Sequence, residues 1–210
     1  MQITILGAGN MGSALAKQLA RAGHQVRITS RDPAKARVVA DAVPGSTAVA
    51  AKDAASGSDV IVVATGYADA VPALRSLGSL AGKIVIDITN PLTPDYMGLT
   101  VGFSTSAAEE IAKAVPGAEV VKAFNTLFAQ VLANGPAPAG NEAVPVYFAS
   151  DSGRAKQTDK ALIESIGFKA VDAGGLKNAR YLEPLAGLNI YFGYGAGHGT
   201  SIAPTWMKAA

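Results

Sequence analysis

Short apolar runs alternate with amphipathic stretches along most of the chain. The apolar runs, each expected to form a β-strand, cover residues 1–6, 25–30, 47–50, 59–64, 84–88, 118–124, 144–149 and 168–172. The run at 59–64 is almost uninterrupted, which is typical of a strand buried on both faces of a parallel sheet. Strands that alternate with helices predict an α/β fold, built on a Rossmann-like, doubly wound and mostly parallel sheet.

Helices are expected between these strands, and several have recognisable ends. Asp32 is expected to cap the second helix, with Pro33 in its first turn. The last helix is expected at 178–192, and the four glycines within 193–199 should make it fray, kink or depend on a partner. Other helices are expected after residue 12 and at 68–80, 106–115, 126–132 and 152–166, and the most linker-like stretch is 133–141.

The first strand leads into a glycine-rich turn and then a helix, and the turn reads Gly7-Ala8-Gly9-Asn10-Met11-Gly12. A strand, a G-x-G-x-x-G turn and a helix in this order are the context of a dinucleotide-binding fingerprint. Gly7 allows the sharp turn, Gly9 lets a pyrophosphate approach the backbone, and Gly12 lets the helix pack tightly. The N–H groups at the helix N-terminus attract phosphates, so we expect all six residues to bind a dinucleotide.

The end of the second strand indicates which dinucleotide is bound. NAD-binding folds of this type usually carry an acidic residue there, whereas this chain has Thr29-Ser30-Arg31, with Lys35 one helical turn later. The hydroxyl of Ser30 and the guanidinium of Arg31 suit a phosphate dianion. The pattern therefore favours NADP(H) over NAD(H); the alternative is that Arg31 and Lys35 are solvated surface charges.

Small and polar residues also follow the later strands, and the carboxyl ends of parallel strands meet at one edge of the sheet. Ala64-Thr65-Gly66 and Asn90 are expected to border the cofactor at this edge. We expect Asn90, Asn125 and Thr126 to surround the reacting rings in positioning roles, together with Thr65. For the two threonines, capping of strand ends is the alternative.

The loop expected at 93–105 carries the apolar side chains of Tyr96, Met97 and Phe103. They either cover a planar ligand beside the nucleotide site or pack into the core. The sequence alone does not choose between these two roles.

Four titratable residues are expected to take no part in the chemistry. Glu109 and Glu110 are adjacent near the start of a helix, where adjacent positions do not face each other. We expect them to form a solvated face that favours the helix dipole. His24 is expected in a turn, and His198, among the glycines near the end of the chain, is expected to be incidental.

Composition narrows the class of protein. The 210 residues suit one domain, or one with a small appendage, and the 49% hydrophobic content argues against disorder. A net charge of +2 without a basic run argues against a nucleic-acid partner. The chain has no cysteine, which excludes disulfides and thiolate ligands, and no metal site is expected. Without a bilayer-spanning stretch, and with a strand in place of a signal peptide, a cytoplasmic protein with no membrane partner is expected.

Several motifs together resemble the NADPH-dependent F420 reductase family over essentially the whole chain. Besides the glycine turn and residues 29–31, they are DITNPL at 87–92, SAAE at 106–109, VVKAFNT at 120–126, VDAG at 171–174 and ARYLE at 179–183. The chain is also similar to the cytosolic reductase module of the STEAP metalloreductases over the same segments.

This resemblance implies an NADP(H)-binding Rossmann domain over 1–124 and a smaller C-terminal part over 125–210, which completes the substrate cleft and the contacts of a homodimer. It implies that hydride passes directly between NADP(H) and a deazaflavin (F420) or flavin co-substrate. Such chemistry belongs to the cofactors, so no acid/base constellation is expected.

The identity of the hydride acceptor is less constrained. The archaeal F420 enzymes carry His where this chain has Asn125, and hydroxyl residues near Pro184 and Ala186, whereas the flavin-reducing STEAP-like variants also carry Asn. Two other functions stay open. One is a non-catalytic NADP(H) sensor. The other is a reductase of a small imine or carbonyl, although the segment after Phe124 is short for the helical dimerisation domain that imine reductases use.

Overall fold

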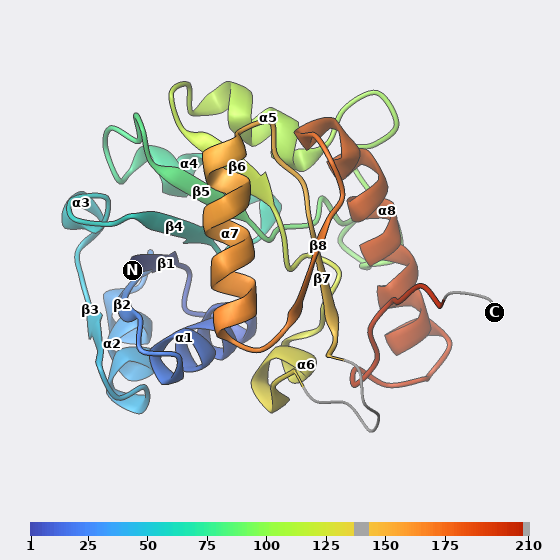
Figure 1. Ribbon diagram of the computed structural model, residues 1–210, viewed down its shortest axis with the longest axis horizontal. Helices are drawn as coiled ribbons and strands as arrows, with labels where there is room; N and C mark the ends of the chain where they lie inside the picture. The colour runs from blue at the N-terminus through green and yellow to red at the C-terminus, as the bar shows by residue number, and fades with distance from the viewer. Residues whose placement is uncertain (137–142, 208–210) are drawn as a thin grey trace.

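The main sheet contains six parallel strands. In the computed structural model, which describes residues 1–136 and 143–207, they are ordered β3-β2-β1-β4-β5-β6 (Figure 1). The strands are β1 (Gln2–Leu6), β2 (Gln25–Thr29), β3 (Ser46–Ala48), β4 (Val60–Val63), β5 (Ile84–Asp87) and β6 (Glu119–Lys122). The order reverses between β1 and β4, and ligands of such sheets bind beside this switch point, at the carboxyl ends of the strands.

Helices cover both faces of this sheet. One hydrophobic cluster joins one face to α1 (Asn10–Arg21), α2 (Pro33–Ala42) and α7 (Gly153–Ser165), as in Leu15 and Leu19 packed with Ile3 and Ile5. A second cluster joins the other face to α3 (Ala51–Ala54), α4 (Tyr67–Arg75) and α5 (Ala107–Ala114). The alternating side chains of β4 divide between these two clusters, which is why its sequence is apolar throughout. The prediction of a doubly wound α/β fold is confirmed.

A smaller parallel sheet follows in the chain. It consists of β7 (Pro145–Phe148) and β8 (Lys169–Asp172), and an antiparallel bridge between Lys122 and Ala149 connects it to β6. Val146 and Phe148 belong to the same hydrophobic cluster as the side chains of α1 and α7. Two further helices complete this part, α6 (Ala129–Asn134) and α8 (Ala179–Ile190), the latter preceded by a short 3-10 turn at Leu176–Asn178.

Several element ends differ from the sequence predictions. Helix α4 ends at Arg75 rather than residue 80, and the chain turns at Gly78, whose φ is +84°. Helix α8 ends at Ile190 and continues as a π-helical segment, Tyr191–Gly195. The regular α-helix thus ends before the first of the four glycines, and the π-helical segment contains Gly193 and Gly195. Of the predicted linker at 133–141, the first two residues belong to α6, and residues 137–141 lie outside the described residues.

Within residues 1–136 and 143–207, no helix has the length and apolar character needed to cross a bilayer. In the same ranges, no three His, Asp or Glu side chains gather in a way that could hold a metal ion.

Candidate functional site

The glycine turn lies at the switch point between β1 and β4. Gly7 has a φ of +127°, and a Cβ atom there would collide with the backbone carbonyl of Ala64 at the end of β4. A Cβ on Gly12 would collide with the carbonyl of Gly7. At these two positions the β1–α1 turn therefore has room for a hydrogen atom but not for a side chain. At Gly9, by contrast, an added Cβ would have nothing within 4 Å, so this part of the turn faces open space.

Helix α1 presents its N-terminus at this turn. Gly9 occupies the N-cap position without a side-chain cap, and the N–H of Ser13 is the first to bond back to a carbonyl of the turn, that of Gly9 at 2.8 Å. The N–H groups of Asn10, Met11 and Gly12 precede that bond and have no helical carbonyl to pair with. Ala8 lies inside the same turn. The six predicted residues thus form the turn and the first turn of α1, and their N–H donors suit an anion.

The end of β2 is cationic and exposed. The side chain of Arg31 is 90% exposed, and its contact with Asp69 is a single long ion pair of 3.5 Å. Lys35 is exposed in the first turn of α2, while Ser30 Oγ donates to the backbone carbonyl of Asp32 at 2.5 Å. Asp32 itself accepts from the N–H of Ala34 at 2.9 Å, which confirms it as the cap of α2. Arg31 is therefore free to turn toward an anion bound at this edge.

Asn90 and Asn125 lie in direct contact. Asn90 follows β5, Asn125 follows β6, and Asn125 Nδ2 donates to Asn90 Oδ1 at 3.0 Å. In return, Asn90 Nδ2 donates to the backbone carbonyl of Asn125 at 2.8 Å. The same Asn125 amide group also donates to the carbonyl of Leu182 in α8 at 3.0 Å. The sequence placed both asparagines at the edge of the sheet, and the fold joins them to each other and to α8.

Buried polar atoms without partners gather near this pair. Among the described residues, Asn125 Oδ1, Thr126 Oγ1 and Thr89 Oγ1 are buried and accept or donate no hydrogen bond. The backbone carbonyl of Thr126 accepts from Asn189 Nδ2 at 3.0 Å, so this segment is also held by α8. Thr65 is only partly buried, and its hydroxyl donates to the carbonyl of Gly66 at 3.0 Å. Unsatisfied buried groups are unusual in native folds and are found at sites that bind a ligand or water.

The sequence analysis missed a buried charge cluster beneath these asparagines. Lys122 Nζ lies 2.9 Å from Asp87 Oδ2 and 2.8 Å from Glu183 Oε1, and the three side chains are between 0% and 1% exposed. Glu183 also accepts from the N–H groups of Ala107 and Ala108, at 2.9 and 3.2 Å, where α5 begins. A carboxylate at a helix N-terminus is favoured by the helix dipole.

The charges in this cluster compensate one another. Complete burial by itself lowers the pKa of Lys122, but the carboxylates of Asp87 and Glu183 outweigh burial and raise that pKa above its ordinary value. The lysine therefore stays protonated. A signal for the cluster was present in the sequence, because Asp87 and Lys122 each follow a run of apolar strand residues, and buried charges require partners.

Tyr67 is a second residue at this edge that received no role from the sequence. It begins α4, directly after Gly66. Partial burial raises the pKa of the Tyr67 phenol, and the negative charges of Glu110, Glu183 and Asp87 add to the effect. The phenol is therefore a neutral hydroxyl throughout the physiological range.

Glu109 is not on a solvated face, so that expectation was wrong for this residue. Arg180 donates two hydrogen bonds to its carboxylate, at 2.9 and 2.7 Å, and these bonds lower the pKa of Glu109. Ser106 caps the same helix and also donates to Glu109. Glu110 is more exposed and pairs with Lys113 at 3.0 Å. The difference arises because α8 packs on one side of α5, which local sequence does not reveal.

The loop at 93–105 presents its apolar side chains to solvent. The exposed fractions of Tyr96, Met97 and Phe103 are 62%, 50% and 96%, so packing in the core, one of the two alternatives, is wrong. Leu99 of this loop lies next to Gly187 in α8, where an added Cβ would be 3.9 Å from its side chain. The loop thus borders α8.

The remaining predicted residues lie elsewhere. His24 Nε2 hydrogen-bonds Ser165 Oγ at 2.8 Å in the turn between α1 and β2. His198 is exposed and places its ring edge against Phe192, with centroids 5.9 Å apart. On α8, Pro184 is exposed whereas Ala186 is buried.

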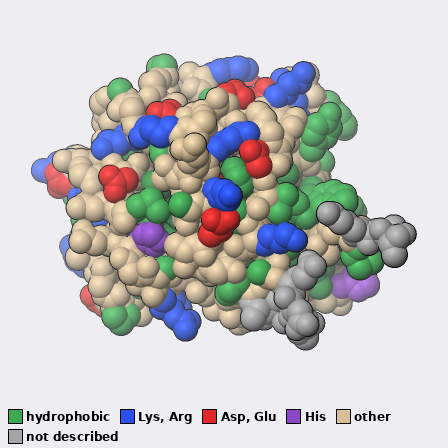
Figure 2. Space-filling model, in the orientation of Figure 1, with side chains coloured by type: hydrophobic (Ala, Val, Ile, Leu, Met, Phe, Trp, Pro, Cys, Tyr) green, Lys and Arg blue, Asp and Glu red, His purple; other side chains and the backbone are tan. Residues whose placement is uncertain are grey.

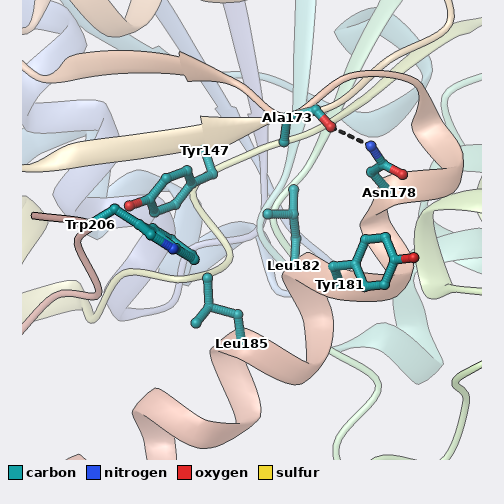
Figure 3. A pocket seen from close by; sticks show the side chains of 7 residues that line it. All are labelled: Tyr147, Ala173, Asn178, Tyr181, Leu182, Leu185 and Trp206. Atoms are coloured by element: carbon teal, nitrogen blue, oxygen red, sulfur yellow. Dashed lines mark hydrogen bonds between the residues drawn. The ribbon is translucent and has the colours of Figure 1, made fainter. Parts of the chain in front are cut away.

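A hollow of about 450 Å³ lies between α8, the small sheet and the last described residues (Figure 3). Tyr147 and Trp206 pack edge to face on one side, with ring centroids 5.1 Å apart. Leu182 and Leu185 of α8 lie toward them, and Tyr181 lines the edge of the hollow. The hollow is almost entirely apolar and is distinct from the edge that carries the asparagines.

Comparisons with known proteins agree with these features. The model of the family of F420-dependent NADP oxidoreductases matches residues 2–91. The F420-dependent NADP reductase of Methanothermobacter thermautotrophicus is 32% identical over 207 residues, covering 90% of this chain and 88% of that protein. A crystal structure from Arthrobacter sp. FB24, provisionally assigned as an F420-dependent NADP reductase, is 31% identical with a TM-score of 0.83 and covers 95% of this chain and 96% of its own.

The chain is also similar to part of a larger protein. Metalloreductase STEAP3 of Rattus norvegicus is 30% identical over 185 residues, which cover 88% of this chain but 36% of that protein. The chain thus spans about a third of the length of this relative.

Proposed function

We propose a hydride-transfer reaction on the premise that the chain belongs to the family of F420-dependent NADP oxidoreductases and is an NADP(H)-dependent oxidoreductase. In the proposed reaction, a hydride passes between NADPH and a deazaflavin such as F420, or a flavin. The observation that carries the proposal is the linked pair Asn90 and Asn125, which stands with three unsatisfied buried atoms at the same sheet edge as the glycine turn.

The residues at this edge fit NADP(H). The open space at Gly9 and the free N–H groups of α1 suit the pyrophosphate. Ser30, Arg31 and Lys35 would hold the 2′-phosphate, because a guanidinium with one weak ion pair can reorient at little cost. The segment Ala64-Thr65-Gly66, together with Asn90, would border the nicotinamide half.

The chain's own groups would then position the reactants and exclude water. When bound, the dinucleotide supplies two electrons and a proton as a hydride, and the second proton required by the acceptor comes from water. Asn90 and Asn125 are fixed by each other and by α8, so they offer polar atoms at constant positions. The exposed rings of Tyr96 and Phe103 would cover the acceptor, because burying their apolar surface stabilises a closed site. Alignment of the reacting rings is the main catalytic requirement of such a transfer.

The identity of the acceptor is open to a direct test. Purified protein would be mixed with NADPH and, in parallel, with F420, FMN, FAD and riboflavin, and NADPH oxidation would be followed by its absorbance. Turnover with F420 places the chain among deazaflavin reductases, and turnover with flavins alone places it nearer the STEAP-like reductases. Tight NADPH binding without turnover on any acceptor contradicts the proposal and favours a sensor or an imine or carbonyl reductase.

We also propose that a second copy of the chain covers the outer face of α8. Tyr181 and Leu188 of this face, and Tyr191 directly after the helix, are 75%, 50% and 52% exposed, and the one charged residue between them in the chain, Glu183, is buried. Figure 2 shows hydrophobic side chains gathered on the right of the molecule, where α8 lies in Figure 1. Because this face is contiguous with the apolar hollow that Tyr181 and Leu185 line, one two-fold interface would cover both.

A further inference from the structure

Two layers of contacts join the ends of β5 and β6 to α8. In the inner layer, Lys122 lies between Asp87 and Glu183, at 2.9 and 2.8 Å. In the outer layer, Asn125 Nδ2 donates to Asn90 Oδ1 and to the carbonyl of the residue before Glu183, both at 3.0 Å. Asn90 follows Asp87, and Asn125 follows Lys122, by three positions in the chain. The same three segments are therefore tied together twice.

The inner layer also fixes the backbone that carries Asn90. Lys122 Nζ donates to the carbonyl of Thr89 at 2.5 Å, and Asp87 Oδ1 accepts from the N–H of Thr89 at 2.9 Å. Both polar groups of the Thr89 backbone are thus held by the charge cluster. Displacement of Lys122 would release the carbonyl of Thr89, directly before Asn90.

The backbone before Asn125 is held in an unusual conformation. Phe124 is buried and has a φ of +58°, in the left-handed region that side chains with a Cβ rarely adopt. Such residues persist where their surroundings determine them, and they concentrate at functional sites. The carbonyl that accepts from the Asn125 amide belongs to α8, and Glu183 fixes that helix to Lys122 and to the start of α5. The position of the Asn125 amide therefore depends on the inner layer.

We propose that Lys122 and Glu183 are positioning residues, which align the Asn90–Asn125 pair with α8 without contacting a ligand themselves. Their side chains are fully buried, so they act only through the residues they hold. The proposal rests on the proposed hydride transfer, because its consequence is the alignment of the reacting rings. It assigns a role to two charges that the redox chemistry does not require.

The variant Glu183→Gln tests this role. It retains the Asp87–Lys122 ion pair, so no unpaired charge is left in the core. However, the amide has one acceptor oxygen where the carboxylate has two, so it cannot accept from Lys122 and from the N–H groups of both Ala107 and Ala108, which loosens the link between β6, α8 and α5. Glu183→Asp, which keeps the charge with a shorter side chain, serves the same purpose if Glu183→Gln does not fold. The matched control is Arg180→Gln, which breaks a half-buried ion pair between the same two helices but leaves β6 untouched.

The first readout needs no activity. In NMR spectra of the protein, the Asn125 side-chain amide protons should exchange slowly, because both are hydrogen-bonded and buried. We expect Glu183→Gln to lose this protection and Arg180→Gln to keep it. Protection that persists in Glu183→Gln, in a folded protein, overturns the proposal. The exchange measurement does not depend on which acceptor the protein uses. Failure of this proposal can therefore be told apart from failure of the proposed hydride transfer.

The second readout is kinetic and compares the effect of each variant on kcat with its effect on the KM for NADPH. In Glu183→Gln we expect kcat to fall by about tenfold to a hundredfold, as small misplacements of reacting groups do, while the KM for NADPH changes little. Arg180→Gln should retain the kcat of the unmodified protein. Equal losses in both variants, or a change in KM alone, would show that the cluster has only a structural role.

Discussion

Asn90 and Asn125 exchange two hydrogen bonds, one between their side-chain amides at 3.0 Å and one from the Asn90 amide to the Asn125 backbone carbonyl at 2.8 Å. Both N–H groups of the Asn125 side chain are thereby used, since the second donates to Leu182, whereas its Oδ1 is buried and unpaired among the described residues. The pair therefore has a fixed orientation with one acceptor left over.

Replacement of Asn125 by Ala should separate the rate from NADPH binding. The change leaves Asn90 Oδ1 and the Leu182 carbonyl without their donor, which costs about 1–3 kcal/mol in stability for buried groups. We expect kcat to fall by about a hundredfold because the reacting rings lose a fixed neighbour. Steady-state kinetics would measure the fall in kcat, NADPH titration would show whether binding is retained, and denaturant unfolding would measure the loss of stability. The control is Asn178→Ala, which removes a bond of 2.6 Å to Ala173 on the far side of α8 and should leave kcat unchanged. Similar kinetics for the two variants would contradict a role for Asn125.

Replacement of Arg31 by Ala should weaken NADPH binding selectively. The guanidinium is 90% exposed and is expected to bind the 2′-phosphate, which NADH lacks. A charge-assisted bond of this kind is worth about 1.5–3 kcal/mol, so the Kd for NADPH should rise about tenfold to a hundredfold while that for NADH stays constant. Calorimetric titration would measure both. The control variant Asp69→Ala removes the partner of Arg31 and should bind NADPH at least as tightly. If Arg31→Ala weakens both dinucleotides equally, the 2′-phosphate assignment is wrong.

Asp159 should make the protein less stable as pH rises through neutrality. It lies buried on α7 with no hydrogen-bond partner among the described residues, and burial raises the pKa of Asp159 to about 8. The folded state therefore keeps a proton that the unfolded state releases above about pH 4. Folding takes up this proton between pH 4 and 8, so the free energy of unfolding falls with rising pH in that window, by up to about 1.4 kcal/mol per unit, and levels off above it.

Denaturant unfolding between pH 5 and 9 would measure this dependence. We expect Asp159→Asn to remove most of the slope, because the amide does not titrate. Glu164→Gln on the exposed face of the same helix should retain it. A slope that is identical in Asp159→Asn and the unmodified protein would show that Asp159 is not the titrating group.

Replacement of Leu188 by Glu should disrupt the proposed dimer. The variant places a charge on the apolar face of α8, where pairing with a second copy would bury it without a partner. Light scattering after size-exclusion chromatography should report the monomer. The control is Val38→Glu on α2, where an exposed apolar residue lies outside this face. Trp206, the single tryptophan, lines the adjoining hollow, so its fluorescence should change in the first variant only. A monomeric unmodified protein would contradict the proposal.

Much of the nucleotide half could be predicted from local sequence. Turn formation at Gly7, capping by Asp32 and burial of β4 depend on interactions among residues close in the chain or on a repeating apolar pattern. The switch point follows from these elements, because the glycine turn and the end of β4 pack directly against each other. The sequence also placed Asn90 and Asn125 at the edge of the sheet.

Contacts between residues far apart in the chain could be identified only from the tertiary structure. Glu183 lies 61 positions after Lys122 and on another element, and nothing in the sequence between them encodes their ion pair. For the same reason, the partner of Glu109 was missed, since Arg180 reaches it only after α8 packs on α5.

The sequence by itself determined the sheet and the glycine turn, because short-range sterics and the alternation of strands and helices decide those features. Only the tertiary structure decided that Asn90 binds Asn125, that Lys122 joins β5, β6 and α8, and that the rings at 93–105 are exposed. The reason is physical: these relationships depend on which surfaces meet when the two sheets and α8 pack together. A residue's local pattern records that it is polar or apolar, and the fold determines which partner it finds.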